Sequence, residues 1–221
     1  MTDLGPEPQP VNAPEPHAEP HAEQTIPLWL IVTTVLAVII GAGVLVVAIV
    51  TNKDTTKPQA YPATWDPRIL PYVKIADTSD DVFARTMATN VTGTFNTMRE
   101  AATRLNDGGR IVNFSTSVLH MAPPTYGVYV ASKGAVEALT RVFAKELRGR
   151  AITCNAVAPG PVATALLLDG KSDDEVRQFA QMAPLERLGQ PEDIAGVVAF
   201  LAGPDGAWVN GQVLRANGGI A

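Results

Sequence analysis

The sequence Tyr129-Val130-Ala131-Ser132-Lys133 lies between a Ser/Thr-rich stretch, residues 113–117, and the segment NAVAPGPVAT at residues 155–164. Tyr129 and Lys133 are four residues apart, so on a helix they share one face, one turn from each other. An ammonium group near a phenol favours the phenolate and predicts a Tyr129 pKa below its usual value of about 10. Such a phenol can donate and accept a proton near neutral pH. The same spacing is common on solvated helix surfaces, so the neighbouring motifs must decide.

The composition excludes some classes of function. The chain has 221 residues, enough for one full domain with a sizeable core, and a formal net charge of −5. It contains no block of basic residues, which argues against nucleic acid as a partner. Cys154 is the only cysteine, so an internal disulfide is excluded.

The first part of the chain differs in composition from the rest. Residues 1–27 contain seven prolines and five acidic residues but no lysine or arginine, and they predict a disordered Pro/Glu-rich tail. His17 and His21 lie in this tail without further ligands, so we predict no metal site. Residues 51–79 are interrupted by prolines and predict a linker to a domain at residues 80–221.

Residues 28–50 carry no charge over 23 positions, which is long enough to cross a bilayer as a helix. Lysines follow this segment and none precedes it, so the positive-inside rule predicts a single-pass membrane protein with a cytoplasmic C-terminal domain. The alternative is a dinucleotide-binding turn at Gly41-Ala42-Gly43. That fingerprint requires a glycine at the position of Val46, and the residues that follow lack a polar face, so we favour the membrane helix.

From residue 80 onward, helical and strand patterns alternate. This alternation predicts an α/β fold with a parallel sheet covered by helices on both faces. The expected helices are residues 80–105, 126–148, 173–182 and 192–201, and the expected strands are residues 110–115, 151–158 and 211–216.

Several segments of this region, in the same order and at similar separations, resemble the short-chain dehydrogenase/reductase family. The segments are NVTGTF at 90–95, GRIVNFSTS at 109–117, YVASK at 129–133, PGPVAT at 159–164, PLERLGQPEDIA at 184–195 and VNGQVLRANGG at 209–219. The resemblance extends over about 140 residues. It implies an incomplete Rossmann-like parallel sheet, the C-terminal half of that family's fold, here preceded by a single transmembrane helix.

The resemblance implies hydride transfer between NAD or NADP and a small carbonyl or alcohol substrate. Tyr129 would protonate the carbonyl oxygen, Lys133 would lower the Tyr129 pKa and bind the nicotinamide ribose, and Asn90 would anchor a water. Either Thr116 or Ser117 would polarise the carbonyl. The implied catalytic residues are Asn90, Thr116, Ser117, Tyr129 and Lys133. The implied cofactor-binding residues are Tyr129, Lys133, Pro159, Gly160, Val162 and Thr164.

The glycine-rich turn that holds the pyrophosphate in this family is not visible, because residues 51–89 contain no glycine. Three hypotheses follow. The chain is a membrane-tethered oxidoreductase whose cofactor site is completed elsewhere, an inactive family fragment fused to a membrane anchor, or an interaction module. The resemblance also implies a homo-oligomer formed through the helices at 80–105 and 126–148. It implies a mobile lid over the substrate at 165–168, whose apolar residues would suit an apolar substrate; the alternative is that these residues belong to the core.

Overall fold

The computed structural model describes residues 72–221. The predicted tail, the predicted membrane helix at 28–50 and most of the predicted linker lie outside the described residues. The described end of the linker contains a short 3-10 turn, η2 (Ile75–Asp77). Among residues 72–221, no helix combines the length and the apolar composition that a membrane crossing requires.

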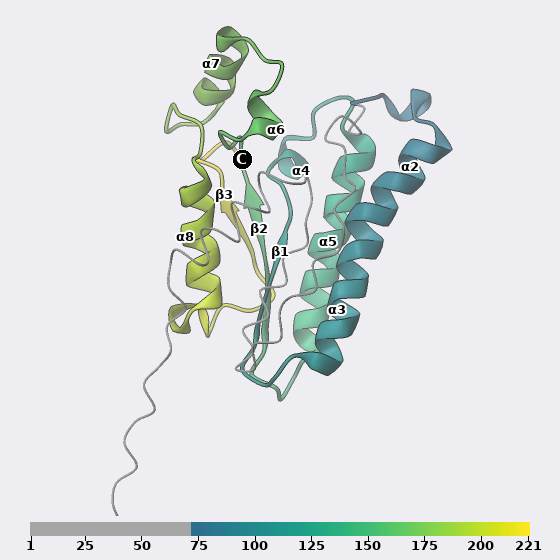
Figure 1. The fold of residues 1–221 in the computed structure, drawn as a ribbon, viewed down its shortest axis with the longest axis vertical. Coiled ribbons are helices and arrows are strands. Elements are labelled where there is room, and N and C mark those ends of the chain that lie inside the picture. Colours follow the sequence, from purple (N-terminus) through teal and green to yellow (C-terminus); the bar gives the residue numbers. More distant parts are fainter. Residues whose placement is uncertain (1–71) are drawn as a thin grey trace, which may run out of the picture.

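Three parallel strands form the centre of the described domain (Figure 1). They are β1 (Arg110–Phe114), β2 (Thr153–Pro159) and β3 (Val213–Ala216), in the spatial order β1-β2-β3. Val112 is paired with Asn155, and Val157 is paired with Leu214. The connection between each pair of neighbouring strands contains helices, as the crossover between parallel strands requires. The predicted parallel sheet is therefore confirmed.

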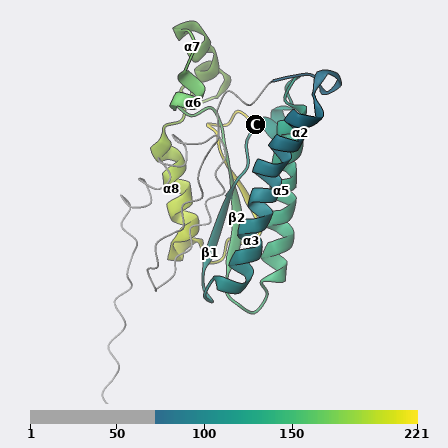
Figure 2. The ribbon, with the colours of Figure 1, turned by 45° about the vertical axis from the view of Figure 1, so that its right-hand side comes forward.

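Helices cover both faces of the sheet, as predicted. The helices α2 (Asp80–Met87), α3 (Gly93–Arg104) and α5 (Gly127–Glu146) lie on one side, and α8 (Pro191–Ala202) lies on the other (Figures 1 and 2). The helix predicted at residues 80–105 is divided into α2 and α3 by η3, and every other strand and helix predicted from residue 80 onward is present, with ends that differ by at most a few residues. Four short elements were not predicted: α4 (Val118–Met121), α6 (Ala165–Leu168), η3 (Ala88–Thr92) and η4 (Pro204–Gly206).

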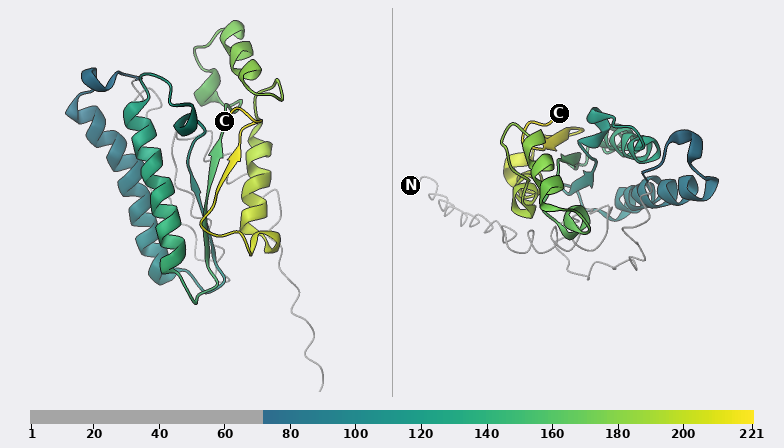
Figure 3. Two further views of the ribbon diagram at one scale, coloured as in Figure 1. Left: turned by 180° about the vertical axis from the view of Figure 1, so that it is seen from behind. Right: turned by 90° about the horizontal axis from the view of Figure 1, so that it is seen from above.

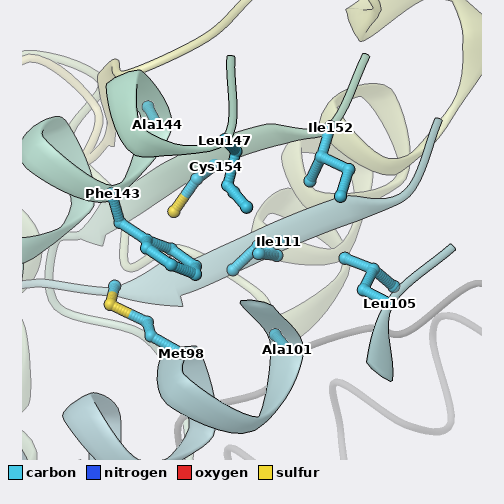
Figure 4. Packing of buried hydrophobic residues seen from close by; sticks show 9 residues of the cluster. All are labelled: Met98, Ala101, Leu105, Ile111, Phe143, Ala144, Leu147, Ile152 and Cys154. Atoms are coloured by element: carbon cyan, nitrogen blue, oxygen red, sulfur yellow. The ribbon is translucent and has the colours of Figure 1, made fainter. Parts of the chain in front are cut away.

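The hydrophobic core consists of two clusters separated by the sheet. Successive side chains of a strand point to opposite faces, so Ile111 contributes to one cluster and Val112 to the other. The first cluster joins β1 and β2 to α3 and α5 and includes Phe143 and Leu147 (Figure 4). The second cluster joins the sheet to α8 through residues such as Val198. Burial of apolar surface on both faces is the main contribution to the stability of this domain.

The carboxyl ends of the strands meet at one edge of the sheet. The short helices α4 and α6 lie at this edge, and α7 (Asp173–Met182) extends beyond it (Figures 1 and 3). Ser172 and Glu175 form a capping box that begins α7. In open α/β sheets, ligands bind outside this edge.

Candidate active site

The sequence motifs at 113–117 and 155–164 come together because β1 and β2 are adjacent. Beyond the paired strand residues, the Ser115 amide donates to the Val157 carbonyl at 2.7 Å and the Ser117 amide donates to the Pro159 carbonyl at 2.9 Å. These bonds continue the ladder past the end of β1. They fix the three hydroxyl-bearing residues 115–117 beside the end of β2.

Tyr129 lies in the first turn of α5, and its phenol is hydrogen-bonded to the Thr116 side chain. Burial raises the pKa of Tyr129 to about 12, and the hydrogen bond to Thr116 acts in the opposite direction. The phenol is therefore protonated at neutral pH in this structure. It is a proton donor that already has a hydroxyl partner.

Lys133 is one turn further along α5 and is only 2% exposed. Its Nζ donates to the Phe114 carbonyl at 2.9 Å and lies 5.9 Å from the centre of the Tyr129 ring. Burial lowers the pKa of Lys133 to about 7. The prediction that Lys133 lowers the Tyr129 pKa is wrong for this structure, because burial penalises the charged form of both groups.

The structure distinguishes the two candidate hydroxyls. Thr116 meets Tyr129, whereas Ser117 points to the other side of the segment. The Ser117 hydroxyl donates to the Ala158 carbonyl at 3.1 Å and accepts from Asn217 Nδ2 at 2.9 Å. Ser117 therefore links β1, β2 and the C-terminal tail, and Thr116 is the hydroxyl beside the phenol.

Asn90 lies in the π-helical turn η3, between α2 and α3. Its Nδ2 donates to the Ser132 hydroxyl at 2.8 Å, and that hydroxyl donates to the Tyr129 carbonyl at 2.7 Å. Asn90 thus fixes the turn of α5 that carries Tyr129 and Lys133. The sequence predicted one regular helix here, and a π-helical turn inserted into a helix often marks a functional site.

The segment after β2 follows the edge of the site. Gly160 donates to the Ala216 carbonyl at 3.0 Å, and a Cβ at this position would lie 2.8 Å from Cα of Asn217, so only glycine fits. Val162 forms an isolated parallel β-bridge with Gly189. The Thr164 hydroxyl donates weakly to the Val162 carbonyl at 3.4 Å. Pro159, the last residue of β2, completes the predicted set on one continuous edge.

These residues fit the nicotinamide end of a dinucleotide. The ammonium form of Lys133 has three donors, and the protein contact described for it is one carbonyl, so it can also bind ribose hydroxyls. The pyrophosphate end has no counterpart among the described residues, and the sequence has no glycine between Gly43 and Gly93. Within residues 72–221, no three His, Cys, Asp or Glu side chains are grouped to hold a metal.

Sequence analysis missed a buried carboxylate behind the site. Glu137 is 5% exposed and accepts a hydrogen bond from the Ser115 hydroxyl at 2.7 Å. Arg141 approaches the other carboxylate oxygen at 3.4 Å. The spacing of Lys133, Glu137 and Arg141 places them on one face of α5, and this was the available signal.

Comparison with known proteins supports the resemblance. Residues 69–221 match a family model described as enoyl-(acyl carrier protein) reductase. A Picea abies protein named short-chain type dehydrogenase/reductase is 51% identical over 150 residues, which make up 67% of this chain and 55% of that protein. An NADPH-dependent aldehyde reductase-like protein of Arabidopsis thaliana is 45% identical, over 67% of this chain and 56% of that protein. The solved structure of the angucycline C-6 ketoreductase LanV with bound NADP has a TM-score of 0.63 at 32% identity, over 67% of this chain and 57% of that one.

The chain belongs to the short-chain dehydrogenase/reductase family. The predicted resemblance is confirmed over the C-terminal part, together with the Rossmann-like α/β fold. This family member spans 55% of the length of the Picea abies relative. The family match begins at residue 69, so it does not extend to the predicted membrane helix at 28–50.

Proposed function

We propose that this chain carries the catalytic half of an NAD(P)H-dependent carbonyl reductase, with Tyr129 as the proton donor. The observation that supports this function is the group formed by the partly exposed Tyr129 and the buried Thr116 and Lys133 at the carboxyl edge of the sheet. The names of the relatives, an NADPH-dependent aldehyde reductase-like protein and a ketoreductase with bound NADP, support the cofactor and the carbonyl substrate.

A bound reduced nicotinamide would supply the hydride. The protein's contribution is to hold the carbonyl and deliver a proton to its oxygen. The Tyr129 phenol, with its raised pKa, is protonated at neutral pH and breaks its O–H bond only when negative charge develops on the substrate oxygen. The Thr116 hydroxyl, already beside the phenol, donates a hydrogen bond to the same oxygen and stabilises that charge.

Lys133, Val162 and Thr164 would hold the nicotinamide riboside. Lys133 is fixed by the Phe114 carbonyl, and its other donors are available for ribose hydroxyls. The backbone of Val162 and the hydroxyl of Thr164 lie on the loop that follows β2, with Pro159 and Gly160 forming its start. Asn90 acts through Ser132 to fix the N-terminal turns of α5.

The test measures binding of NADPH and NADH to the full-length protein in detergent. Binding is detected by nicotinamide fluorescence and by the shift in melting temperature. We expect saturable binding, reduction of carbonyl compounds, and a loss of turnover of about 10²- to 10⁴-fold in Tyr129→Phe with binding retained. Thr116→Val should lower turnover much more than Ser117→Ala, because Ser117 faces away from the phenol. A cooperatively melting protein that binds neither cofactor would contradict the proposal.

The second candidate is a catalytic half without activity, serving as an interaction module. It is favoured by one observation, the glycine-free stretch from residue 44 to residue 92, where a pyrophosphate-binding turn is expected. Cofactor binding separates the two candidates, since this alternative predicts an unchanged melting temperature at every NADPH concentration.

We also propose that residues 28–50 tether the domain to a membrane on its cytoplasmic side. We propose further that the helices at 80–105 (α2 and α3) and 126–148 (α5) form a homo-oligomer. The uncharged 23-residue segment supports the tether. Extraction of membranes with alkaline carbonate tests the tether. Release of the protein from the membranes into the supernatant would contradict the proposed membrane helix. The molecular mass of residues 72–221 in solution tests the oligomer.

A further inference from the structure

The ring of the proposed proton donor, Tyr129, contacts the ring of Tyr126, which in turn contacts the ring of Tyr72. The rings of Tyr72 and Tyr126 have centroids 4.2 Å apart at 31°, so one lies over the other. Tyr126 meets Tyr129 edge to face, with centroids 6.4 Å apart at 67°. Tyr126 therefore presents one face to Tyr72 and is also in contact with the catalytic ring.

A small hollow lies between α2 and the start of α5, and two of these three rings border it. Tyr72 and Tyr129 both line it, and none of the eight lining residues is charged. Val82 and Val128 contribute apolar surface. Thr125 has a φ of 76°, which is unfavourable for a β-branched residue. Backbone strain of this kind concentrates at sites that bind ligands.

Tyr126 and Tyr72, the two stacked residues, differ in how strongly the fold fixes their positions. Tyr126 precedes the first residue of α5, and its carbonyl accepts the Val130 amide at 2.8 Å, which fixes it to the helix. Tyr72 lies outside the helices and strands, and it is 53% exposed. Val73, the residue that follows it, is partly buried at the hollow, whereas Ile75 of the same segment is 77% exposed. Tyr72 can therefore leave the stack at much lower cost than Tyr126.

We infer that Tyr126 is a stacking surface for an aromatic substrate and that Tyr72 occupies this surface in the free protein. The substrate class is an aryl ketone or aryl aldehyde, whose ring replaces that of Tyr72 while its carbonyl enters the hollow toward Tyr129. The role of the carbonyl rests on the proposed function, whereas the stacking surface rests on the ring geometry alone. A planar ring suits this position because stacked aromatic pairs prefer offset contacts 4.5–7 Å apart between centroids, beyond simple burial.

The consequence is that two adjacent tyrosines have opposite effects on binding. Removing Tyr72 removes a competitor for the Tyr126 surface, so Tyr72→Ala should bind an aryl ketone about two- to tenfold more tightly. Removing the surface itself in Tyr126→Leu should weaken binding by a similar factor. Tyr126→Phe keeps the ring and should bind with near-normal affinity.

The experiment measures binding of 4′-fluoroacetophenone to the full-length protein by ¹⁹F NMR, with cyclohexyl methyl ketone as a non-aromatic competitor of similar size. We expect opposite shifts in Kd for Tyr72→Ala and Tyr126→Leu, and little change for the cyclohexyl ketone in Tyr126→Leu. Thermal melts of each variant establish that it is folded. If both substitutions weaken binding, or neither changes it, the inference is overturned.

The measurement also separates this inference from the proposed function, because binding is read without turnover. Opposite Kd shifts in a protein that never reduces the ketone would retain the stacking surface and remove the reductase. Reduction of the ketone with equal Kd values in all variants would retain the reductase and remove the stacking surface.

Discussion

The two halves of helix α5 face the same strands, but ionisable side chains are buried toward its N-terminal half and large apolar side chains toward its C-terminal end. The C-terminal half contributes Phe143, Ala144 and Leu147 to an apolar cluster with Ile111 of β1 (Figure 4). The N-terminal half buries Lys133 against Phe114, and Glu137 at the middle of the helix is buried against Ser115, at the carboxyl end of the same strand. Burial of apolar surface stabilises the fold, whereas burial of a charged group costs free energy unless partners compensate it. The contrast indicates that apolar burial in the C-terminal half stabilises a helix whose N-terminal half carries buried ionisable groups at a cost in free energy.

The largest expected effect comes from the apolar half. Phe143→Ala removes a large side chain that is 8% exposed, and we expect unfolding free energy to fall by about 3–5 kcal/mol. Urea denaturation of residues 72–221 measures this loss. The neighbouring Val142 is 55% exposed, so Val142→Ala should cost less than about 0.5 kcal/mol. Equal losses in the two variants would contradict the assignment of the core to this half.

The polar half should show a pH dependence that the apolar half lacks. Burial lowers the Lys133 pKa from 10.5 to about 7, so between these values the unfolded chain binds more protons than the folded one. Stability should therefore rise with pH above 7, by at most about 1.4 kcal/mol per pH unit from this group. The contribution of Lys133 is therefore best measured between pH 7 and pH 9. At higher pH, Cys154 and Tyr129, whose pKa values burial raises to about 12, contribute the opposite slope.

Lys133→Met should remove this slope and stabilise the domain at pH 7, and denaturation curves at pH 7, 8 and 9 measure it. The exposed Lys145 on the same helix provides a matched control, and Lys145→Met should keep the slope. An unchanged slope in Lys133→Met would mean that Lys133 is not the buried base.

A smaller loss is expected at Glu137, the buried carboxylate behind the site. Glu137→Ala leaves the Ser115 hydroxyl without its acceptor, and we expect a loss of about 1–3 kcal/mol. Glu137→Gln keeps an oxygen at this place and should cost less. Arg141 is half exposed and 3.4 Å from Glu137, so Arg141→Gln should change stability by less than about 1 kcal/mol. If Arg141→Gln cost as much as Glu137→Ala, the surface ion pair would be the important contact.

Sequence patterns located the elements and most of the site, but not its electrostatics. Tyr129 and Lys133 were found from their spacing together with the order of the neighbouring motifs, because a helix fixes which residues share a face. The direction of the Tyr129 pKa shift was wrong, since the burial that raises it depends on chain segments distant in sequence. The choice between Thr116 and Ser117 likewise required knowing which side of β1 faces α5. Tyr72 could not be placed at all, because an aromatic contact across 54 positions leaves no periodic signal.

The smallest expected effect is at an exposed carboxylate, which tests whether burial is what makes the polar half costly. Asp193 accepts two hydrogen bonds from Arg187, at 2.6 and 3.0 Å, and one from the Gln190 amide at the start of α8, yet its side chain is 40% exposed. We expect Asp193→Asn to cost only about 0.5–1 kcal/mol at pH 7.

These contacts lower the Asp193 pKa to about 2, so the stabilisation is complete above the unfolded value near 4 and is lost as pH falls toward 2. Acid denaturation of the wild-type and Asp193→Asn proteins measures this difference, which should shrink from pH 5 to pH 2. If Asp193→Asn lowered the unfolding free energy as much as Glu137→Ala, the number of hydrogen bonds rather than burial would determine how much a carboxylate contributes to stability. The contrast between the halves of α5 would then reflect bonding geometry instead of solvation.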